Sequence, residues 1–233
     1  MNWLSFSKKF HPSWHKHIKP FIESAECDLI FSHLKSRSNM GHKIMPISHN
    51  TFKAFEIPME EIKVVILGGS PYNGIADGVT IANGLFLDCS HIAVPSYELR
   101  NFYRGIEIEI YNGLSLQYRD TQSIDYLTQQ GVMMLNASLT TEEHTNHEEV
   151  WESFINHIMK ILDSLNIPII FIGELAKSYS NLISNQWKIT ELDDIPGGPG
   201  QVWDTQGTFR KIDDVLEELN KDTVMWLNID VPF

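Results

Sequence analysis

One short segment joins the end of a strand to a turn and an aromatic residue: Val64–Gly74 has the sequence VVILGGSPYNG. The apolar run that opens it predicts a buried strand, and the Gly-Gly-Ser-Pro sequence that follows predicts a turn. In open α/β sheets, ligands bind at the carboxyl ends of parallel strands, so this turn is a candidate active-site loop. It offers the hydroxyl of Ser70, but no carboxylate, histidine or cysteine follows until Asp77. A lone hydroxyl has little acid-base capacity near neutral pH, so the loop has the position of a catalytic loop without its usual chemistry.

Other residue types that often carry chemistry do not form a convincing cluster. His11 and His15 are four residues apart with a proline between them, and His15 and His17 face apart on a helix, so we expect no metal site. Cys89 has no evident base nearby and is predicted to be inert. The acidic pair Asp193-Asp194 is predicted to lie on the solvated surface.

Length and composition favour one intracellular domain. The chain has 233 residues, of which 42% are hydrophobic and 21% charged, as in ordinary globular proteins. We therefore expect a single domain over residues 1–233. The apolar runs are too short to span a bilayer, and the N-terminus does not resemble a signal peptide. Two cysteines are too few for a disulfide framework, which favours a reducing, cytoplasmic or otherwise intracellular setting.

The charge balance bears on possible partners. The net charge is -12 and the pI is about 5.2. Proteins that bind nucleic acid generally gain most of their affinity from lysine and arginine on phosphates, so general DNA binding is disfavoured. An acidic chain of this kind fits a protein that binds another protein, or one that resembles DNA in charge.

Hydrophobic periodicity predicts alternating strands and helices, and hence a parallel sheet covered on both faces. The predicted strands are Lys63–Leu67, Val132–Leu135, Ile167–Ile172 and Trp187–Leu192. The predicted helices are Trp14–Leu34, Glu98–Tyr111, Glu148–Leu165, Leu175–Ile183 and Phe209–Leu219.

From about Ser13 to Trp226 the chain resembles family 1 uracil-DNA glycosylases, which flip uracil out of DNA and hydrolyse its glycosidic bond. The family motif VVILGQDPYHG stands here as VVILGGSPYNG. Further matching segments follow in the family's order: Ser13–Ile18, Ala82–Leu85, Glu98–Arg104, Gly131–Thr140, His147 with Trp151 and Phe154, and Phe171–Ala176. The resemblance implies an α/β domain with a central four-stranded parallel sheet flanked by helices on both faces.

Two residues that are chemical in the family are retained. The resemblance implies that Tyr72 blocks C5-substituted pyrimidines and that Asn136 reads the uracil edge. The aromatic residue that stacks on uracil aligns with Leu87 in direct register, with Phe86 one place away. An alternative is that Tyr72 and Asn136 persist because they pack and bond well in a small polar crevice.

The family's two catalytic positions are substituted. The aspartate of the first loop, which acts on the attacking water, corresponds to Ser70. The histidine of the last loop, which donates a hydrogen bond to the departing uracil, corresponds to Ile195. No histidine occurs between Asp193 and Gly197 in any register.

The positions that grip DNA phosphates are changed as well. Serines that contact phosphates in the family correspond to Glu98, to Glu174 and, in the last loop, to a glycine-rich segment at Gly197. The intercalating loop would be Gln201–Gly207, which contains no basic residue. A carboxylate about 4 Å from a phosphate costs on the order of 4 kcal/mol at an effective dielectric near 20, so DNA binding is doubtful.

The leading hypothesis is a degenerate glycosylase scaffold without cofactors that acts through a protein partner or self-association on the former DNA face. A viral or phage protein, active in the host cell as a replication accessory or host-takeover factor, would fit this description. The alternative is an active glycosylase with altered chemistry, in which Asn73, Asn83 or Asp88 positions water. A third reading is a protein that recognises a modified base without cutting it.

Overall fold

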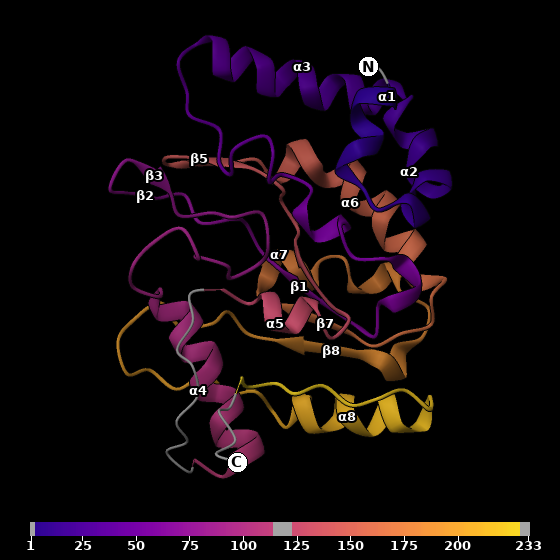
Figure 1. Cartoon of the computed structure of the whole chain (residues 1–233), viewed down its shortest axis with the longest axis vertical. Helices are drawn as coiled ribbons and strands as arrows, with labels where there is room; N and C mark the ends of the chain where they lie inside the picture. Colours follow the sequence, from indigo (N-terminus) through magenta and orange to yellow (C-terminus); the bar gives the residue numbers. More distant parts are fainter. Residues whose placement is uncertain (1–2, 114–122, 229–233) are drawn as a thin grey trace.

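The computed structural model describes residues 3–113 and 123–228 and is built around one parallel sheet (Figure 1). The strand order is β4-β1-β7-β8, and all neighbouring pairs are parallel. The strands span Val64–Gly68 (β1), Val132–Asn136 (β4), Ile169–Ile172 (β7) and Ile189–Leu192 (β8). β1 is central and fully buried, with Leu67 paired to both Leu135 and Phe171. Buried apolar strands of this kind need cover on both faces.

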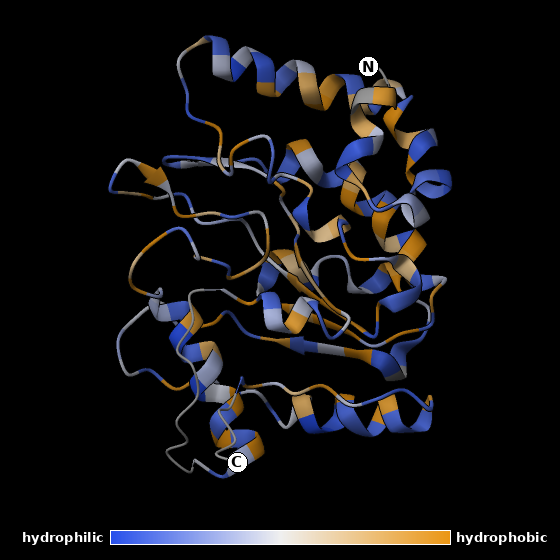
Figure 2. Cartoon of the chain, viewed as in Figure 1, coloured by the Kyte–Doolittle hydropathy of each residue, from blue (hydrophilic) through white to orange (hydrophobic). Residues whose placement is uncertain are grey.

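Helices provide that cover. In Figure 1, α2, α3 and α6 lie above the sheet and α4 and α8 lie below it, which confirms the predicted fold class. The α-helices span Trp3–Phe6 (α1), His15–Ile22 (α2), Ala25–Asn39 (α3), Tyr97–Tyr111 (α4), Asp125–Thr128 (α5), Glu148–Asp163 (α6), Glu174–Lys177 (α7) and Thr208–Glu218 (α8). Short 3-10 turns span Ser7–Lys9, Pro12–Trp14, Lys53–Phe55, Met59–Glu61, Ser180–Leu182 and Gln186–Lys188. Figure 2 shows hydrophobic residues gathered in the central strands, whereas α8 alternates hydrophobic and hydrophilic residues. No helix in the described part of the chain is long and apolar enough to cross a membrane.

The predicted helical region Trp14–Leu34 is confirmed, but it is not one continuous helix. The structure has two helices here, α2 and α3, separated at Ser24. The Ser24 side chain accepts a hydrogen bond from the backbone N–H of Cys27 at 3.3 Å and caps α3. A serine N-cap satisfies a donor that the first helical turn leaves free, so it starts a new helix instead of continuing the old one.

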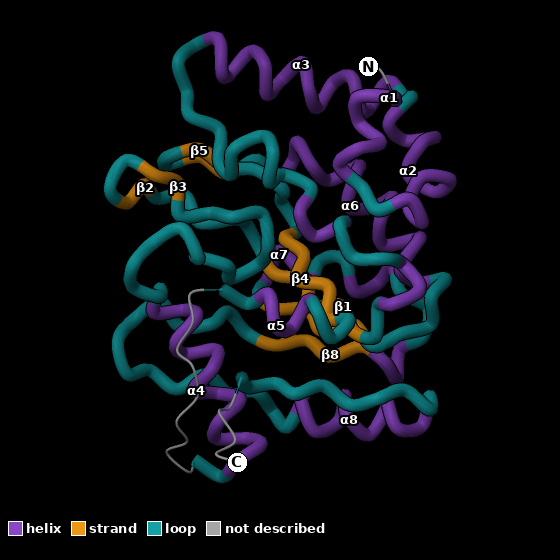
Figure 3. Tube along the Cα trace, viewed as in Figure 1, coloured by secondary structure: helices purple, strands orange, loops and turns teal. Residues whose placement is uncertain are grey.

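Two short hairpins complete the fold, and neither was predicted. The first pairs β2 (Ile75–Ala76) with β3 (Val79–Thr80) through Asp77-Gly78, and both turn residues have positive φ. An Asp-Gly pair suits such a turn because both residue types tolerate the left-handed region. The second hairpin pairs β5 (Thr141–Glu142) with β6 (Thr145–Asn146). Figure 3 shows long loops on the side of the molecule where these hairpins lie.

A buried polar network anchors the β5–β6 hairpin. Glu142 and His147 are each 2% exposed, and Nε2 of His147 lies 2.9 Å from Oε1 of Glu142. Arg37 on α3 donates from Nε and Nη2 to the two carboxylate oxygens of Glu142, at 2.9 and 2.7 Å. Trp151 donates to Oγ1 of Thr140, and this hydroxyl lies 2.9 Å from Nδ1 of His147. The hydrogen bond from Arg37 lowers the pKa of Glu142 to about 2, and burial lowers the pKa of His147.

Replacing Arg37 with methionine tests this network. Arg37→Met leaves a buried carboxylate without its cation, and we expect the free energy of unfolding to fall by about 3 kcal/mol near pH 7. In the unchanged protein the Glu142 carboxylate, with a pKa of about 2 against an ordinary 4.5, stabilises the fold above pH 4.5, and this contribution is lost as the pH falls toward 2. Urea denaturation at several pH values measures both effects. The acid-induced loss should be smaller in Arg37→Met than in Lys35→Met, a control on an exposed position of the same helix. Equal stability of the two variants at neutral pH would contradict the assigned role.

Candidate functional site

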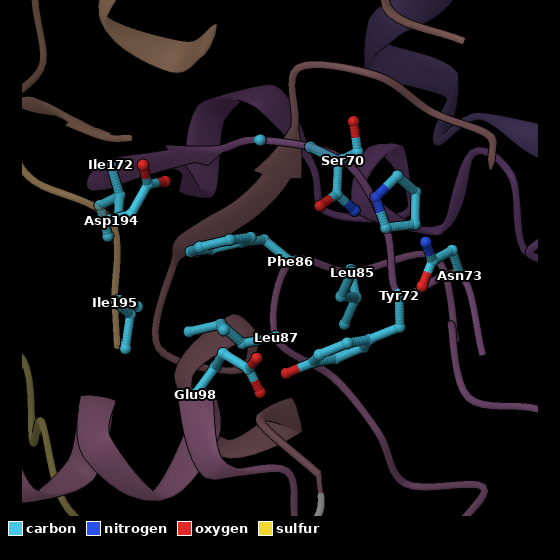
Figure 4. Close-up of a pocket in the computed structure, with 13 residues that line it drawn as sticks. Ser70, Tyr72, Asn73, Leu85, Phe86, Leu87, Glu98, Ile172, Asp194 and Ile195 are labelled. Atoms are coloured by element: carbon cyan, nitrogen blue, oxygen red, sulfur yellow. The ribbon is translucent and has the colours of Figure 1, made fainter. Parts of the chain in front are cut away.

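A cavity of about 290 Å³ opens where the parallel strands end (Figure 4). Each of the four strands contributes to it either directly or through the loop that follows. Ser70 and Tyr72 follow β1, Asn136 ends β4, Ile172 ends β7, and Ile195 follows β8. The remaining lining residues are Gly69, Pro71, Asn73, Leu85, Phe86, Leu87, Glu98 and Asp194. The carboxyl edge of the sheet therefore brings together residues that are far apart in the sequence, as ligand sites of open α/β sheets do.

Phe86 packs against the backbone of β1. A Cβ atom added to Gly68 would lie 2.0 Å from the Phe86 ring, so only a glycine admits the ring at this position. Figure 4 shows the ring extending across the pocket between Ser70 and Leu87. Leu87 also lines the pocket and has a positive φ of 64°, an uncommon conformation for leucine. The structure thus places both candidate stacking residues at the pocket, and the aromatic surface comes from Phe86.

Tyr72 is held in place by a hydrogen bond. Its hydroxyl lies 2.7 Å from Oγ of Ser96, and this oxygen accepts the backbone N–H of Leu99 and caps α4. Burial raises the pKa of Tyr72, and the nearby Glu98 carboxylate contributes to the rise. Tyr72 is therefore a neutral, fixed part of the pocket wall.

Asn136 offers an unused amide to the pocket. Its side chain is 2% exposed and lines the cavity, and it has no hydrogen-bond partner among the described residues. The amide atoms are not sealed in the core, because they face the open cavity. A ligand that enters the cavity would supply the missing hydrogen bonds.

Ser70 carries no charge, but a carboxylate lies behind it. Its hydroxyl donates to Oε1 of Glu148 at 3.3 Å. Glu148 is the first residue of α6 and also accepts a hydrogen bond from Asn146 at 3.2 Å. The hydrophobic periodicity predicts Glu148 only as the first residue of an amphipathic helix. The position of Glu148 directly after His147, a residue retained from the family motif, was the feature of the sequence that could have indicated this contact.

Asp194 was assigned to the solvated surface, but it also lines the pocket. A Cβ atom on Gly173 would lie 2.0 Å from its Oδ1, so this approach requires the glycine that directly follows β7. In Figure 4 the Asp194 carboxylate lies beside Ile172. The available signal was the position of Asp194 two residues beyond the end of a parallel strand.

Ile195 and Gly197 lie close together in the loop after β8. Ile195 lines the pocket and presents no hydrogen-bond donor from its side chain. A Cβ atom on Gly197 would lie 2.7 Å from Oε1 of Glu98. The Asn101 amide donates to the backbone carbonyls of Pro196 and Gly198 at 2.6 and 2.9 Å, which holds this loop against α4.

Glu174 lies outside the cavity, and its side chain is 86% exposed. Lys177 pairs with Glu174 at 3.0 Å and with Asp193 at 2.8 Å. The hydrogen bonds to these two carboxylates, first that to Asp193, raise the pKa of Lys177. The positive charge of Lys177 is therefore already balanced by these two carboxylates.

Part of the segment Gln201–Gly207, which was expected to intercalate into DNA, belongs to the hydrophobic core. Trp203 is buried, packs against Phe102 at a ring-centroid distance of 5.8 Å, and donates to the Asp193 carbonyl at 3.0 Å. Val202 is exposed. The indole of Trp203 closes the core beneath α4, so it cannot enter a DNA stack without unpacking.

The three residues considered for positioning a water molecule, Asn73, Asn83 and Asp88, divide into two groups. Asn73 lines the pocket. Asn83 and Asp88 are buried away from it, where the Asn83 amide donates to Asp88 at 3.1 Å and Lys53 lies 3.5 Å from the same carboxylate. Asn83 and Asp88 belong to a structural network, which removes them as candidates for positioning water in the pocket.

A glycine pair tests the pocket geometry. We expect Gly68→Ala to displace Phe86 and to lower the free energy of unfolding by about 1–3 kcal/mol, because the new methyl group collides with the ring. Gly69→Ala is the matched control, since a Cβ atom there meets nothing within 4 Å. Urea denaturation and a crystal structure of each variant make the comparison. Similar stability of the two variants, with Phe86 in place, would contradict the assigned contact.

Comparisons with known proteins agree with this geometry. No family model matches the chain. It is 27% identical over 227 residues to a uracil-DNA glycosylase of Psychromonas ingrahamii, covering 92% of this chain and 100% of that protein. It is 29% identical over 182 residues to one of Xanthomonas oryzae pv. oryzae, covering 75% and 72% of the two chains. The crystal structure of mimivirus uracil-DNA glycosylase superposes with a TM-score of 0.80 at 21% identity, over 97% of this chain and 89% of that one. A mimivirus UNG variant in complex with UGI gives a TM-score of 0.79 at 22% identity, over 97% and 91%. The chain is therefore similar in sequence to uracil-DNA glycosylases over most of its length, and it shares their fold.

Proposed function

We propose that the protein binds an unpaired pyrimidine base in the pocket at the carboxyl edge of its sheet and lacks the charged groups for efficient uracil excision. The observation that carries this proposal is the amide of Asn136, which faces the open cavity and makes no hydrogen bond to another described residue. An amide can donate and accept at once, which suits the edge of a base.

The shape of the cavity also favours a single base. Its volume of about 290 Å³ lies at the lower end for small-molecule pockets. The Phe86 ring supplies a flat apolar surface for stacking, and Tyr72 is fixed by Ser96 in the opposite part of the wall. A planar ring with a polar edge fits these surfaces.

The chemistry of the pocket argues against fast excision. Removing a positioned acid or base typically costs about 10²–10⁴-fold in rate, and Ser70 offers neither. Removing a donor at the atom that gains negative charge costs about 10²–10³-fold, and Ile195 offers no donor. Glu148 reaches the pocket only through the Ser70 hydroxyl. We therefore expect uracil excision to be slower than in working glycosylases by about 10⁴-fold or more.

A binding experiment tests the proposal. Uracil, thymine and cytosine are titrated separately into the protein and followed by NMR chemical-shift changes. We expect at least one base to bind, and Asn136→Ala to weaken that binding by about tenfold because its hydrogen bonds are lost. Asn181→Ala, at an exposed asparagine on the 3-10 turn Ser180–Leu182, should have no effect. Absence of binding by all three bases, or equal binding by the Asn136 and Asn181 variants, would overturn the proposal.

A second function is favoured by the charge of the surface around the pocket: docking of a basic protein partner. Glu174 and Asp193 neutralise Lys177, and Glu98 and Asp194 add two further carboxylates at the pocket. Phosphates would meet repulsion of several kcal/mol on such a face. Lysine or arginine side chains of a partner would instead be attracted there.

Restoring first the acid-base residues and then the serines expected to contact phosphate separates a loss of catalytic groups from a loss of DNA binding. We expect Ser70→Asp with Ile195→His to leave excision of uracil from DNA undetectable, because the acidic face still repels the phosphates. Adding Glu98→Ser and Glu174→Ser should then produce measurable excision at low salt. Ser70→Asn with Ile195→Gln, combined with the same two serines, is a control of similar size without a base or acid. Efficient excision by the first double variant would show that the acidic face is no barrier, and the docking function would lose its support.

A further inference from the structure

We infer that a groove between α6 and the 3-10 turn Ser180–Leu182 binds an arginine side chain that a segment of a partner protein presents. The groove has a volume of about 430 Å³ and is lined by residues of α6 on one side and by residues from the range 175–182 on the other. It shares no lining residue with the pocket at the carboxyl edge of the sheet. The inference is therefore independent of both functions proposed above.

One wall of the groove is acidic. Glu148, Glu152 and Asn156 are spaced four residues apart and lie along one side of α6, and Glu149 adds a third carboxylate. None of the three glutamates has an ion pair among the described residues, and no described lysine, arginine or histidine lines the groove. A helix N-terminus favours carboxylates in its first turn, which accounts for Glu148 and Glu149, but Glu152 lies beyond that turn. The described part of the chain thus supplies no cation for this wall.

Glu148 has one carboxylate oxygen to offer. Its hydrogen bonds from Ser70 at 3.3 Å and from Asn146 at 3.2 Å both go to Oε1. Its Oε2 accepts no hydrogen bond from another described residue. Glu148 can therefore hold the loop after β1 with one oxygen and accept a donor from a ligand in the groove with the other.

Tyr179 points to a ligand independently of the carboxylates. Its side chain lines the groove and is only 5% exposed, yet its hydroxyl makes no hydrogen bond to another described residue. The hydroxyl is not sealed in the core, so it reaches the groove. Burial raises the pKa of Tyr179 to about 12, and the nearby carboxylates of Glu152 and Glu148 add to the rise. A ligand between this hydroxyl and the carboxylates would supply the missing hydrogen bond.

The chemistry of these groups favours arginine over other cations. The described histidine, cysteine and acidic residues form no group of three that could hold a metal ion, so an organic cation fits better. A guanidinium presents five N–H donors in one plane and can reach carboxylates and the tyrosine oxygen together, whereas a lysine ammonium is a compact and strongly hydrated charge. The half-buried Leu175 and Leu182 provide apolar surface for the methylene groups of the arginine side chain.

The remaining polar residues of the groove favour an arginine within a peptide. Asn156 and Asn181 line the groove, and the side chain of neither makes a hydrogen bond to another described residue. An amide both donates and accepts, so these two side chains can pair with the N–H and C=O groups of a peptide backbone. A free cation would leave both amides unused.

Peptides that differ in one side chain test the inference on the full chain. A capped alanine-arginine-alanine tripeptide, its lysine and citrulline counterparts, and free arginine are titrated separately and followed by NMR at an ionic strength of about 0.15 M. The protein variants are Glu152→Gln, Tyr179→Phe and, as a control, Glu218→Gln. Glu218 is exposed at the end of α8, on the opposite face of the sheet from α6, so its variant removes the same charge far from the groove. Circular dichroism establishes that each variant is folded.

We expect the arginine peptide to bind at least about threefold more tightly than the lysine peptide, which is within the range that one hydrogen bond contributes. The uncharged citrulline peptide should show no saturable binding. Glu152→Gln and Tyr179→Phe should each weaken binding of the arginine peptide by at least about threefold, because each removes an acceptor or its charge. Glu218→Gln should leave that binding unchanged.

Several outcomes would overturn the inference. Absence of saturable binding by the arginine peptide would remove the site. Equal binding of the lysine peptide would reduce it to a general cation site, and equal binding of free arginine would make it a small-molecule site. Equal weakening by Glu152→Gln and Glu218→Gln would show that only the net charge of -12 attracts the peptide. Because Glu152 is exposed, its variant decides the question even where Tyr179→Phe is destabilised.

Discussion

The contact between the Phe86 ring and the backbone of Gly68 is the constraint on which the rest of the site depends. β1 is one of the two inner strands, and its last residue must be a glycine because the ring occupies the space of a Cβ atom. The ring then forms one surface of the cavity, and the loop from Gly69 to Asn73 passes around it. Close packing allows few alternatives at such a point, so the shape of the pocket is tied to the core of the sheet.

A second set of interactions connects the N-terminal helices to the pocket. Arg37 on α3 pairs with Glu142, which holds His147, and the next residue, Glu148, accepts the hydrogen bond from Ser70. The charge of Glu142 is paired with the Arg37 guanidinium and its Oε1 is hydrogen-bonded to His147, which allows the carboxylate to remain ionised inside the protein. The network thus orients the start of α6 toward the loop after β1. The carboxylate of Glu148 thus lies behind Ser70, and its negative charge is separated from the cavity by the Ser70 side chain.

The sequence pattern predicted the framework well, and the reason is physical. Strands buried on both faces are continuous apolar runs, so β1, β4 and β7 were placed within two residues of their ends. The division of the N-terminal region was missed because the cap at Ser24 competes with a helical pattern on either side of it. The burial of Trp203 and the position of Asp194 at the pocket were missed because each residue was judged from its neighbours in sequence; Asp194 is exposed, as predicted, and also lines the cavity. Burial of the first and the approach of the second to Gly173 are contacts between distant segments.

The sequence by itself determined the class of fold, the order of the strands and helices along the chain, and the residue types in the loops that follow the strands. These properties follow from local periodicity and from the side chains themselves. The tertiary structure decided which groups share the cavity: it brought Asp194 and Glu98 to the rim, put Glu148 behind Ser70, left the Asn136 amide unpaired among the described residues, and moved Asn83 and Asp88 into a separate network. Parallel strands end at one edge of a sheet, so proximity there depends on strand order and loop packing, which local sequence does not encode.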